Sequence, residues 1–463
     1  MTHLEADIIV VGGGISGLSV AWELQRRGAE VVLLEAAARS GGTIGSTHEQ
    51  GCLIEAGPSS TLDTTPLITA LLDATGIAAE RIAPQPAARQ RFILRDGKLL
   101  ALPQSPFAFL TSPLFSPAAK LRLLKEPFLV RGAYDDESVA AFVRRRLGAE
   151  FLDYAINPFV AGVYAGDVET LSVRAAFPRL FELEQRYGSL IRGQLQGALA
   201  RARDMQKSKH AAPMLSFRNG MQTLPDAIAL RLKRIDLGCE VTRITPRQGG
   251  FDIAVAPASG RPGYRARAVV LATPTYVAAK LSAPLASQAA AALDAIPYAP
   301  VALVASVYRR AAIAHALDGF GFLVPQREQR RILGTIFSST LYAERAPPDF
   351  ALLTTFVGGM RQPALAQLAA DEIAALVHSE LTLLLGAALR PEWARVTRWT
   401  RAIPQYTQGH LERIACIERA ERDVPGLFFC ANYRGGISVG DCIKSAWRTA
   451  DQAAAFAAKT SQF

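Results

Sequence analysis

One turn near the N-terminus constrains the fold of this 463-residue chain more than any other feature. Asp7–Val11 is an apolar, β-branched run that predicts a short buried strand, and Ser16–Arg27 has the residue pattern of a helix. Glu30–Leu34 predicts a second buried strand. Strand, glycine-rich turn, helix and strand in this order predict a β-α-β unit, in which two parallel strands are joined by a crossover helix.

The turn contains three glycines, Gly12, Gly14 and Gly17, with the spacing G-x-G-x-x-G. The first allows a tight turn, the second lets the backbone approach a pyrophosphate, and the third permits close packing of the helix. Glu35 ends the second strand, where its carboxylate can bind a ribose diol. A tight turn without a ligand is the alternative. The unit predicts a dinucleotide site with contacts from Gly12, Gly13, Gly14, Ile15, Ser16, Gly17, Glu35 and Ala36.

A second glycine-rich turn, Arg39-Ser40-Gly41-Gly42, follows Glu35 by a few residues. It resembles the flavoprotein pattern in which an R-x-G-G turn continues along the phosphates of FAD, and this favours FAD over NAD. The segment G-C-L-I-E-A-G-P resembles the part of the same proteins that approaches the flavin. A solvated loop and an ordinary strand end are the alternatives for these two segments. The expected cofactor contacts are Arg39, Gly41, Gly42, Gly57 and Pro58.

The segment Gly426–Ala446 repeats this chemistry at the far end of the chain, with a strand pattern, several glycines and then a helix pattern. We expect Asp441 to cap the final helix, and amides at its start to lie beside the flavin or its pyrophosphate. Cys430 is expected to be a buried core cysteine, so that FAD is held non-covalently. A long cofactor that is held from both ends explains two such turns. Further expected contacts are Val241, Gly435, Ser438, Val439 and Gly440.

Composition excludes several other classes of protein. Half of the residues are hydrophobic and 20% are charged, which excludes a disordered chain. The formal charge of +10 comes from scattered basic residues, so no nucleic-acid partner is expected. Five cysteines without a C-x-x-C pair and six isolated histidines predict neither a disulfide framework nor a metal site. No export signal is expected, and four prolines break the longest charge-free stretch, so no transmembrane segment is predicted.

Several longer strings resemble the oxygen-dependent protoporphyrinogen oxidase family, within the group that includes monoamine oxidase and phytoene desaturase. The resemblance runs almost from end to end, and its most selective string is N-P-F-V-A-G-V-Y-A-G-D, which is not expected in amine oxidases. The strings lie at Gln90–Leu99, Asn157–Asp167, Leu333–Ser339, Thr354–Gly359 and Asn432–Gly436.

The resemblance implies a mixed α/β (α+β) fold with three regions. A Rossmann-like FAD-binding domain of the amine-oxidase type would contain residues 1–90, 213–275 and 405–463. A mixed-sheet substrate domain would contain residues 91–104 and 276–404. The Pro-punctuated region 105–212 would be helical. The segment Leu99–Gly132 would bind a membrane interface, because apolar residues such as Phe107 and Phe115 alternate there with Lys120, Arg122 and Lys125. A buried helical lid has the same pattern and is the alternative.

The resemblance also implies oxidation of protoporphyrinogen IX to protoporphyrin IX with FAD and O2, in three two-electron steps that form H2O2. Arg91 is expected to pair with a propionate of the tetrapyrrole, although Arg89 and Arg95 are close enough to leave the choice open. The carbonyl of Gly162 would lie near the macrocycle nitrogens. We assign no catalytic acid or base. The apolar walls that enclose the rings would be Leu323, Ile336 and Phe356.

Three other activities remain as alternatives. Oxidation of coproporphyrinogen III to coproporphyrin III would differ in the cations around the substrate. A flavin amine oxidase or carotenoid desaturase is not expected to carry the long string and Arg91 together. A flavin-free binding protein of the escort type would have lost the first glycine motif, which is intact here. The expected location is the cytoplasm, at the inner face of the cytoplasmic membrane, and a homodimer is a further candidate assembly.

Overall fold

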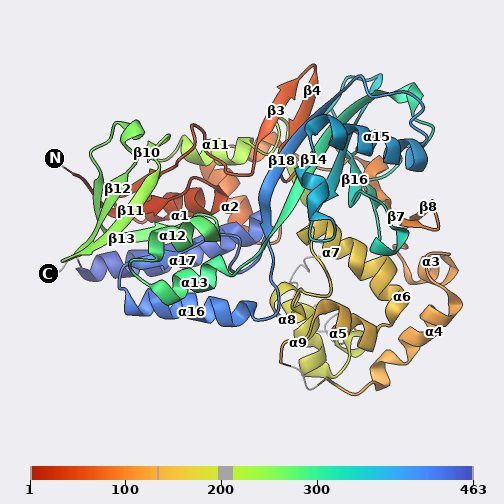
Figure 1. Ribbon diagram of the computed structural model, residues 1–463, viewed down its shortest axis with the longest axis horizontal. Coiled ribbons are helices and arrows are strands. Elements are labelled where there is room, and N and C mark those ends of the chain that lie inside the picture. The colour runs from red at the N-terminus through yellow and green to blue at the C-terminus, as the bar shows by residue number, and fades with distance from the viewer. Residues whose placement is uncertain (1–2, 133–134, 195, 197–211, 461–463) are drawn as a thin grey trace.

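The computed structural model describes residues 3–132, 135–194, 196 and 212–460 of the chain. Two seven-stranded sheets lie side by side in this part, and a group of helices lies below the second sheet in the view of Figure 1. Of the expected helical region 105–212, residues 133–134, 195 and 197–211 lie outside the described residues.

The first sheet is built around the predicted N-terminal strands. β1 is parallel to its neighbours β2 and β13, and the second half of β1 and all of β2 are buried. Continuous apolar burial of this kind is typical of parallel strands that are covered on both faces. The order is β10 (Ile235–Asp236), β2 (Val31–Leu34), β1 (Leu4–Val11), β13 (Tyr264–Leu271), β12 (Gly250–Val255) and β11 (Val241–Arg247), and β19 (Leu427–Phe429) also pairs with β13.

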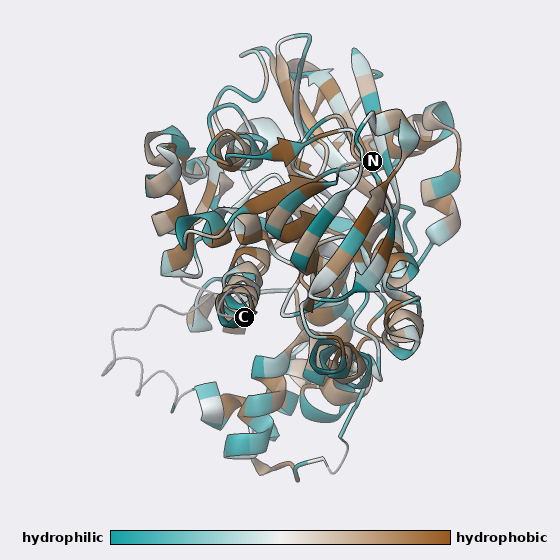
Figure 2. Cartoon of the chain, turned by 90° about the vertical axis from the view of Figure 1, so that its left-hand side faces the viewer, coloured by the Kyte–Doolittle hydropathy of each residue, from teal (hydrophilic) through white to brown (hydrophobic). Residues whose placement is uncertain are grey.

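Helices cover both faces of this sheet, and brown, hydrophobic segments occur along its strands among teal and white ones in Figure 2. One face holds α1 (Ile15–Arg26), α2 (Pro66–Thr75), α11 (Thr223–Ala229) and α17 (Val439–Thr460), together with the fully buried Cys430. The other face holds α12 (Thr275–Ser282), α13 (Ser287–Asp294) and α16 (His410–Asp423). The predicted boundary at residues 275 and 276 is therefore wrong, because α12 and α13 bury their apolar faces against the first sheet.

The second sheet is mixed, as β15 and β7 are parallel and all other pairs are antiparallel. One of its faces packs against α15 (Ala370–Leu385), through Phe322, Phe337 and Leu353 on the sheet. Its opposite face carries the predicted substrate residues Leu323, Ile336 and Phe356. The order is β18 (Trp393–Pro404), β14 (Tyr298–Arg309), β17 (Phe350–Gly358), β16 (Gly334–Phe337), β15 (Gly321–Leu323), β7 (Arg91–Arg95) and β8 (Lys98–Ala101).

The many prolines of the helical region lie where helices begin. Pro106, Pro117 and Pro178 occupy the first turns of helices, where the missing amide hydrogen costs nothing. Among the described residues, no helix is long and apolar enough to cross a membrane. The helices are α3 (Pro106–Thr111), α4 (Pro117–Leu124), α5 (Val139–Arg146), α6 (Ala149–Phe151), a π-helical turn (Leu152–Ile156), α7 (Asn157–Tyr164), α8 (Val173–Ala176) and α9 (Pro178–Tyr187).

Short strands connect the two sheets. A hairpin of β3 (Ser46–Glu49) and β4 (Cys52–Glu55) extends from the first sheet to the second, where Cys52 and Ile54 pack against β14 and β17. A further small sheet consists of β5 (Thr61–Leu62), β9 (Met214–Phe217) and β6 (Arg81–Ile82).

Candidate active site

The glycines of the first turn are required for two different reasons. A Cβ atom at Gly17 would overlap the carbonyl oxygen of Gly12, and one at Gly12 would lie 2.7 Å from the carbonyl oxygen of Ala272. The protein's own packing therefore explains these two glycines. A Cβ atom at Gly14 would have no neighbour within 4 Å. The protein itself leaves this glycine unexplained, but a group that approaches its backbone closely would require it.

The start of α1 next to Gly14 is suited to such a group. Gly14 is the N-cap and supplies no side chain, and the first turn of α1 contains no acidic residue. Among the described residues, none accepts a hydrogen bond from the amides of Ile15, Ser16 or Gly17. Free amides at a helix start bind anions, because the helix dipole adds to their own positive charge. This site therefore fits the pyrophosphate of the predicted FAD.

A second helix start lies beside the first. The Cys442 side chain in the first turn of α17 lies close to that of Ser16 in the first turn of α1. The predicted contacts Val439 and Gly440 belong to the same turn of α17, and Gly435 in the preceding loop has a φ of +85°. The two glycine-rich turns, which are some 400 residues apart in the sequence, are thus brought together.

The prediction that Asp441 caps α17 is wrong. The amide of Asp441 donates to Oγ of Ser438 (3.1 Å), and this hydroxyl donates to Oδ2 of Asp441 (2.7 Å). Ser438 is therefore the capping residue and Asp441 lies three positions later, because the helix begins at Val439 rather than at Asp441.

Glu35, the predicted ribose contact of the cofactor, lies at the carboxyl end of β2. The carboxylate of Glu35 accepts hydrogen bonds from the amides of Gly13 and Ala37, and its backbone carbonyl accepts one from Cys239 (2.8 Å). Ala36 follows Glu35 directly, and Val241, at the start of β11, lies two residues after Cys239. The carboxylate is thus fixed at the edge of the first turn.

Arg39 organises the second glycine-rich turn from within. Its guanidinium donates to the backbone carbonyls of Ser40, Gly42 and Ile44. The amide of Gly41 donates to the carbonyl of Gly13 (2.8 Å), so the two turns lie against one another. Arg39 therefore shapes the loop that would hold the phosphates.

The predicted substrate walls share one face of the second sheet. Leu323 pairs with Gly334, and Gly334 pairs with Phe356, while Ile336 lies two residues further along β16. Directly opposed residues point to the same side, so all three apolar side chains point away from α15. Within β15 and β16, Leu323 and Ile336 are the positions that are not fully buried, and Phe356 is likewise half-buried in β17. Ile336 and Phe356 border a cavity, and Leu323 contacts the backbone at Gly162.

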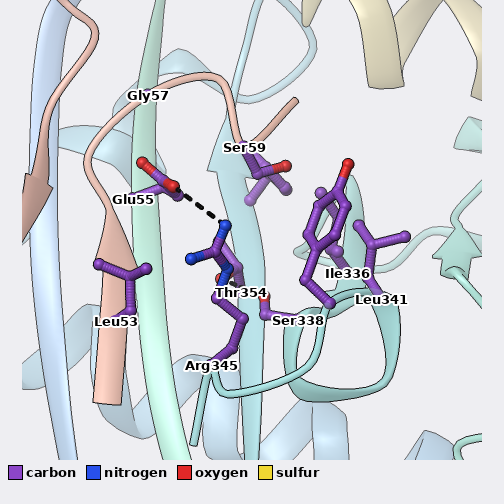
Figure 3. A pocket seen from close by; sticks show the side chains of 11 residues that line it. Leu53, Glu55, Gly57, Ser59, Ile336, Ser338, Leu341, Arg345 and Thr354 are labelled. Carbon is purple, nitrogen blue, oxygen red and sulfur yellow. Dashed lines mark hydrogen bonds and ion pairs between the residues drawn. The ribbon is translucent and has the colours of Figure 1, made fainter. Parts of the chain in front are cut away.

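A cavity of about 20 Å³ joins this wall to the predicted flavin segment (Figure 3). Ile336 and Phe356 line it from the sheet, and Gly57 and Ser59 line it from the chain after β4. Nε1 of Trp399 donates to the carbonyl of Ala56 (2.7 Å) and fixes this segment over the sheet. Pro58 lies between two of these lining residues. The structure thus brings two separately predicted groups of residues to one place.

One ion pair beside the cavity escaped the sequence analysis. The side chains of Glu55 and Arg345 are 3.9 Å apart and both are buried (Figure 3). Burial raises the pKa of the Glu55 carboxyl and lowers the pKa of Arg345. Because the Glu55 carboxylate already accepts from Oγ of Ser46 and the amide of Met221, we assign it no acid or base role. An acid inside the apolar string C-L-I-E-A was the available signal for Glu55, and Arg345 had none.

Helix α7, which holds most of the selective string, lies on the same face of the sheet. A Cβ atom at Gly162 would come within 2.8 Å of Cδ2 of Leu323, so the helix surface at Gly162 contacts the predicted wall. Arg361 fixes the start of α7 by donating to the backbone carbonyls of Asn157 (2.7 Å) and Val324 (2.9 Å). Burial lowers the pKa of Arg361 to about 10.

Tyr406 joins α7 to the C-terminal glycine loop, and the sequence analysis missed it. Its hydroxyl donates to the carbonyl of Asn432 (2.7 Å) and accepts from the amide of Gly436 (3.1 Å). Burial raises its pKa, so the phenol stays neutral. The neighbouring Gln405 donates from Nε2 to the carbonyl of Tyr164, at the end of α7 (2.8 Å). No local spacing signals these contacts, because their partners are distant in the sequence.

The three candidate substrate cations have different environments. Arg95 is occupied, since its guanidinium is 2.6 Å from the carboxylate of Glu150 and stacks on Tyr154. Arg91 is exposed on β7, and its guanidinium lies over the ring of Phe320 at 5.3 Å from the centroid. Arg89 is also exposed, just before β7. The structure therefore removes Arg95 from the choice that the sequence left open.

Known proteins are similar to this chain over nearly its whole length. Residues 15–454 match the family model described as flavin containing amine oxidoreductase. Protoporphyrinogen oxidase 2, chloroplastic/mitochondrial, of Arabidopsis thaliana is 33% identical over 472 residues, which cover 96% of this chain and 93% of the relative. Coproporphyrinogen III oxidase of Bacillus subtilis (strain 168) is 26% identical over 461 residues, which cover 96% of this chain and 97% of the relative. A crystal structure from Exiguobacterium sp. 255-15 has a TM-score of 0.82 at 24% identity and covers 98% of this chain and 99% of its own.

Proposed function

Because this chain belongs to the flavin containing amine oxidoreductase family, we propose that it oxidises protoporphyrinogen IX to protoporphyrin IX with O2 and forms H2O2. The chain is an FAD-dependent oxidoreductase of mixed α/β fold. One observation carries the choice of substrate: the half-buried Leu323, Ile336 and Phe356 form one apolar wall beside the predicted flavin segment, with Arg91 on the same face of the sheet. A flat apolar molecule with an acidic edge fits this arrangement.

The residues of the chain would bind and orient the substrate, and we assign the role of proton acceptor to none of them. Arg91 would hold a propionate through two parallel hydrogen bonds, while the apolar wall excludes water from the rings. Gly162 would bring the backbone of α7 close to the macrocycle. FAD bound at this site would supply the two-electron oxidation, with O2 as the final electron acceptor.

The cofactor would be held from both ends of the chain. We assign the pyrophosphate to the paired starts of α1 and α17, and the ribose to Glu35. The loop around Arg39 and Gly41 and the segment Gly57–Pro58 would extend along the phosphates towards the flavin.

The first test is addition of freshly reduced protoporphyrinogen IX to the purified, yellow protein in aerated buffer. We expect porphyrin fluorescence to rise far faster than with free FAD alone, with H2O2 formed alongside it. A protein with an intact flavin spectrum and no rise above the FAD control would contradict the proposed substrate. An amine or carotenoid substrate would then be tested in the same family.

Coproporphyrinogen III is the second candidate substrate. The B. subtilis relative carries the name coproporphyrinogen III oxidase and covers nearly the whole chain, although the Arabidopsis protoporphyrinogen oxidase is more similar. Comparison of kcat/KM for the two porphyrinogens decides between them.

We also propose that α3, α4 and the chain that follows bind the inner face of the cytoplasmic membrane peripherally. Large apolar side chains in this segment are between 61% and 87% exposed, and Lys120 and Lys125 lie among them. Exposed apolar groups next to cations are typical of a helix at a lipid surface with anionic headgroups. The exposed apolar residues are Phe107, Leu110, Leu121, Leu124, Phe128 and Val130.

A homodimer of the chain remains a prediction.

Paired charge substitutions test the membrane proposal. We expect Phe107→Glu with Phe128→Glu to lower the fraction that sediments with anionic vesicles at least about tenfold. Phe115 is unsuitable, because it is buried and stacks on Phe151 (4.3 Å between centroids), so a charge there would disturb folding. Leu230→Glu with Leu389→Glu, at exposed sites outside the segment, is the matched control. Equal sedimentation of both double variants would refute the proposal.

A further inference from the structure

A second cavity, of about 390 Å³, opens at the end of β7. It is lined by two cations, Arg89 and Arg91, and by two amides, Gln85 and Gln104. Phe320 and Leu102 contribute apolar surface. The lining thus combines positive charge with apolar area, which suits the acidic edge of a largely apolar molecule.

No described carboxylate lines this cavity or forms an ion pair with either arginine. Arg95, two positions further along β7, shows the contrast, because Glu150 occupies it at 2.6 Å. Nε2 of Gln104 donates to the backbone carbonyl of Arg89 (3.0 Å) and holds this residue at the cavity. Two cations without an internal counterion are therefore available to a ligand.

The second cavity adjoins the apolar wall described above. Arg91, Gly321 and Ile336 are paired across three adjacent strands and so lie in one row on one face. Phe320 and Ile336 pack against one buried cluster that includes Ala88, the residue before Arg89. A molecule that covers the wall at Ile336 can therefore reach both arginines with its edge.

We propose that Arg89 is a second carboxylate-binding residue, so that Arg89 and Arg91 together hold two propionates on one edge of the tetrapyrrole. This inference rests on the proposed function. Each guanidinium can donate two parallel hydrogen bonds to a carboxylate, and their spacing along the chain allows neighbouring carboxylates to bind at once.

The arrangement also determines preference between the two porphyrinogens. Protoporphyrinogen IX carries its two propionates on neighbouring rings, whereas coproporphyrinogen III carries propionates on all four rings. The remaining propionates of the latter would face the wall of Leu323, Ile336 and Phe356, where an unpaired carboxylate loses its hydration. The pair of arginines therefore selects the dicarboxylate.

The experiment measures equilibrium binding of protoporphyrin IX and of its dimethyl ester to the FAD-loaded protein, with porphyrin fluorescence as the signal. The variants are Arg89→Gln, Arg91→Gln and the control Lys98→Gln, which removes an exposed charge from neighbouring β8. We expect Arg89→Gln to weaken binding of the diacid about tenfold and to leave binding of the ester unchanged. Its KM for protoporphyrinogen IX should rise by a similar factor at unchanged kcat, and an intact flavin spectrum shows that it is folded.

The outcomes separate the two proposals. If the unsubstituted protein oxidises protoporphyrinogen IX and Arg89→Gln binds the diacid as Lys98→Gln does, Arg89 has no such role and the proposed function stands. An equal loss for diacid and ester would also overturn the role of Arg89, because it would show damage to the cavity rather than loss of a charge contact. If the unsubstituted protein neither oxidises the porphyrinogen nor binds the porphyrin, both proposals fail.

Discussion

Gly17→Ala is expected to yield a protein that does not retain FAD. The added methyl group would overlap the backbone carbonyl oxygen of Gly12 and lie 3.1 Å from Cβ of Ala272. Neither backbone can yield without moving the start of α1 away from β1. Overlap of this kind costs about 3 kcal/mol or more, and the amides that would bind the pyrophosphate move with the helix. FAD affinity should fall by at least about a hundredfold.

Gly14→Ala is the matched substitution, because it adds the same methyl group on the side of the predicted pyrophosphate rather than against the protein. Its Cβ has no neighbour within 4 Å, and the backbone angles of Gly14 (φ −69°, ψ 173°) are open to alanine. We expect this variant to fold as stably as the apoprotein of the unsubstituted chain and yet to be colourless.

Absorbance of the purified proteins near the flavin bands, FAD titration and thermal unfolding of the apoproteins measure these effects. Gly17→Ala should lose both FAD and apoprotein stability, whereas Gly14→Ala should lose FAD alone. Normal FAD retention by Gly14→Ala would show that the space beside Gly14 is not the pyrophosphate site.

Glu126→Gln is expected to destabilise the helical region by about 3–5 kcal/mol. Glu126 and Arg146 are both fully buried, and their side chains are 2.6 Å apart. The carboxylate also accepts from Oγ of Ser189 and from the amides of Leu190 and Ile191. A glutamine would direct its own NH2 group at these donors and leave Arg146 without its nearest counterion.

Hydrogen exchange of the amides in α5 measures this loss locally, which is appropriate in a protein with several regions. Glu169→Gln is the control, since Glu169 pairs with Arg144 on the same helix but the two side chains are about half exposed (49% and 50%). An exposed pair of this kind contributes less than about 1 kcal/mol. Similar exchange in the two variants would mean that the buried pair does not hold the region together.

Some of the site could be predicted from the sequence because its determinants are local. The strand, turn and helix around Gly12, Gly14 and Gly17 follow from short-range backbone sterics, and the fold class and the FAD cofactor are confirmed. Residues such as Leu323 and Phe356 were predicted through a family resemblance, because an apolar residue that borders a cavity has the same local pattern as one in the core.

Two predictions failed, one over the residue at which a helix begins and one over a distant contact. The cap of α17 was assigned to Asp441 because both Ser438 and Asp441 are good capping residues, and only the observed start of the helix separates them. Helices α12 and α13 were assigned to the wrong domain, since the sheet that an amphipathic helix covers is not encoded in its own periodicity.

The sequence by itself determined the β-α-β unit, its glycine turns and the apolar strands of both sheets, because backbone angles and side-chain alternation depend on neighbours a few residues away. The tertiary structure alone decided which residues meet. In the folded protein Glu150 pairs with Arg95, whereas Arg89 and Arg91 both line one cavity. Phe115 is buried against Phe151, whereas Phe107 is exposed. Contacts between residues that are far apart in the chain depend on how the sheets and helices pack, and no short stretch of sequence specifies that packing.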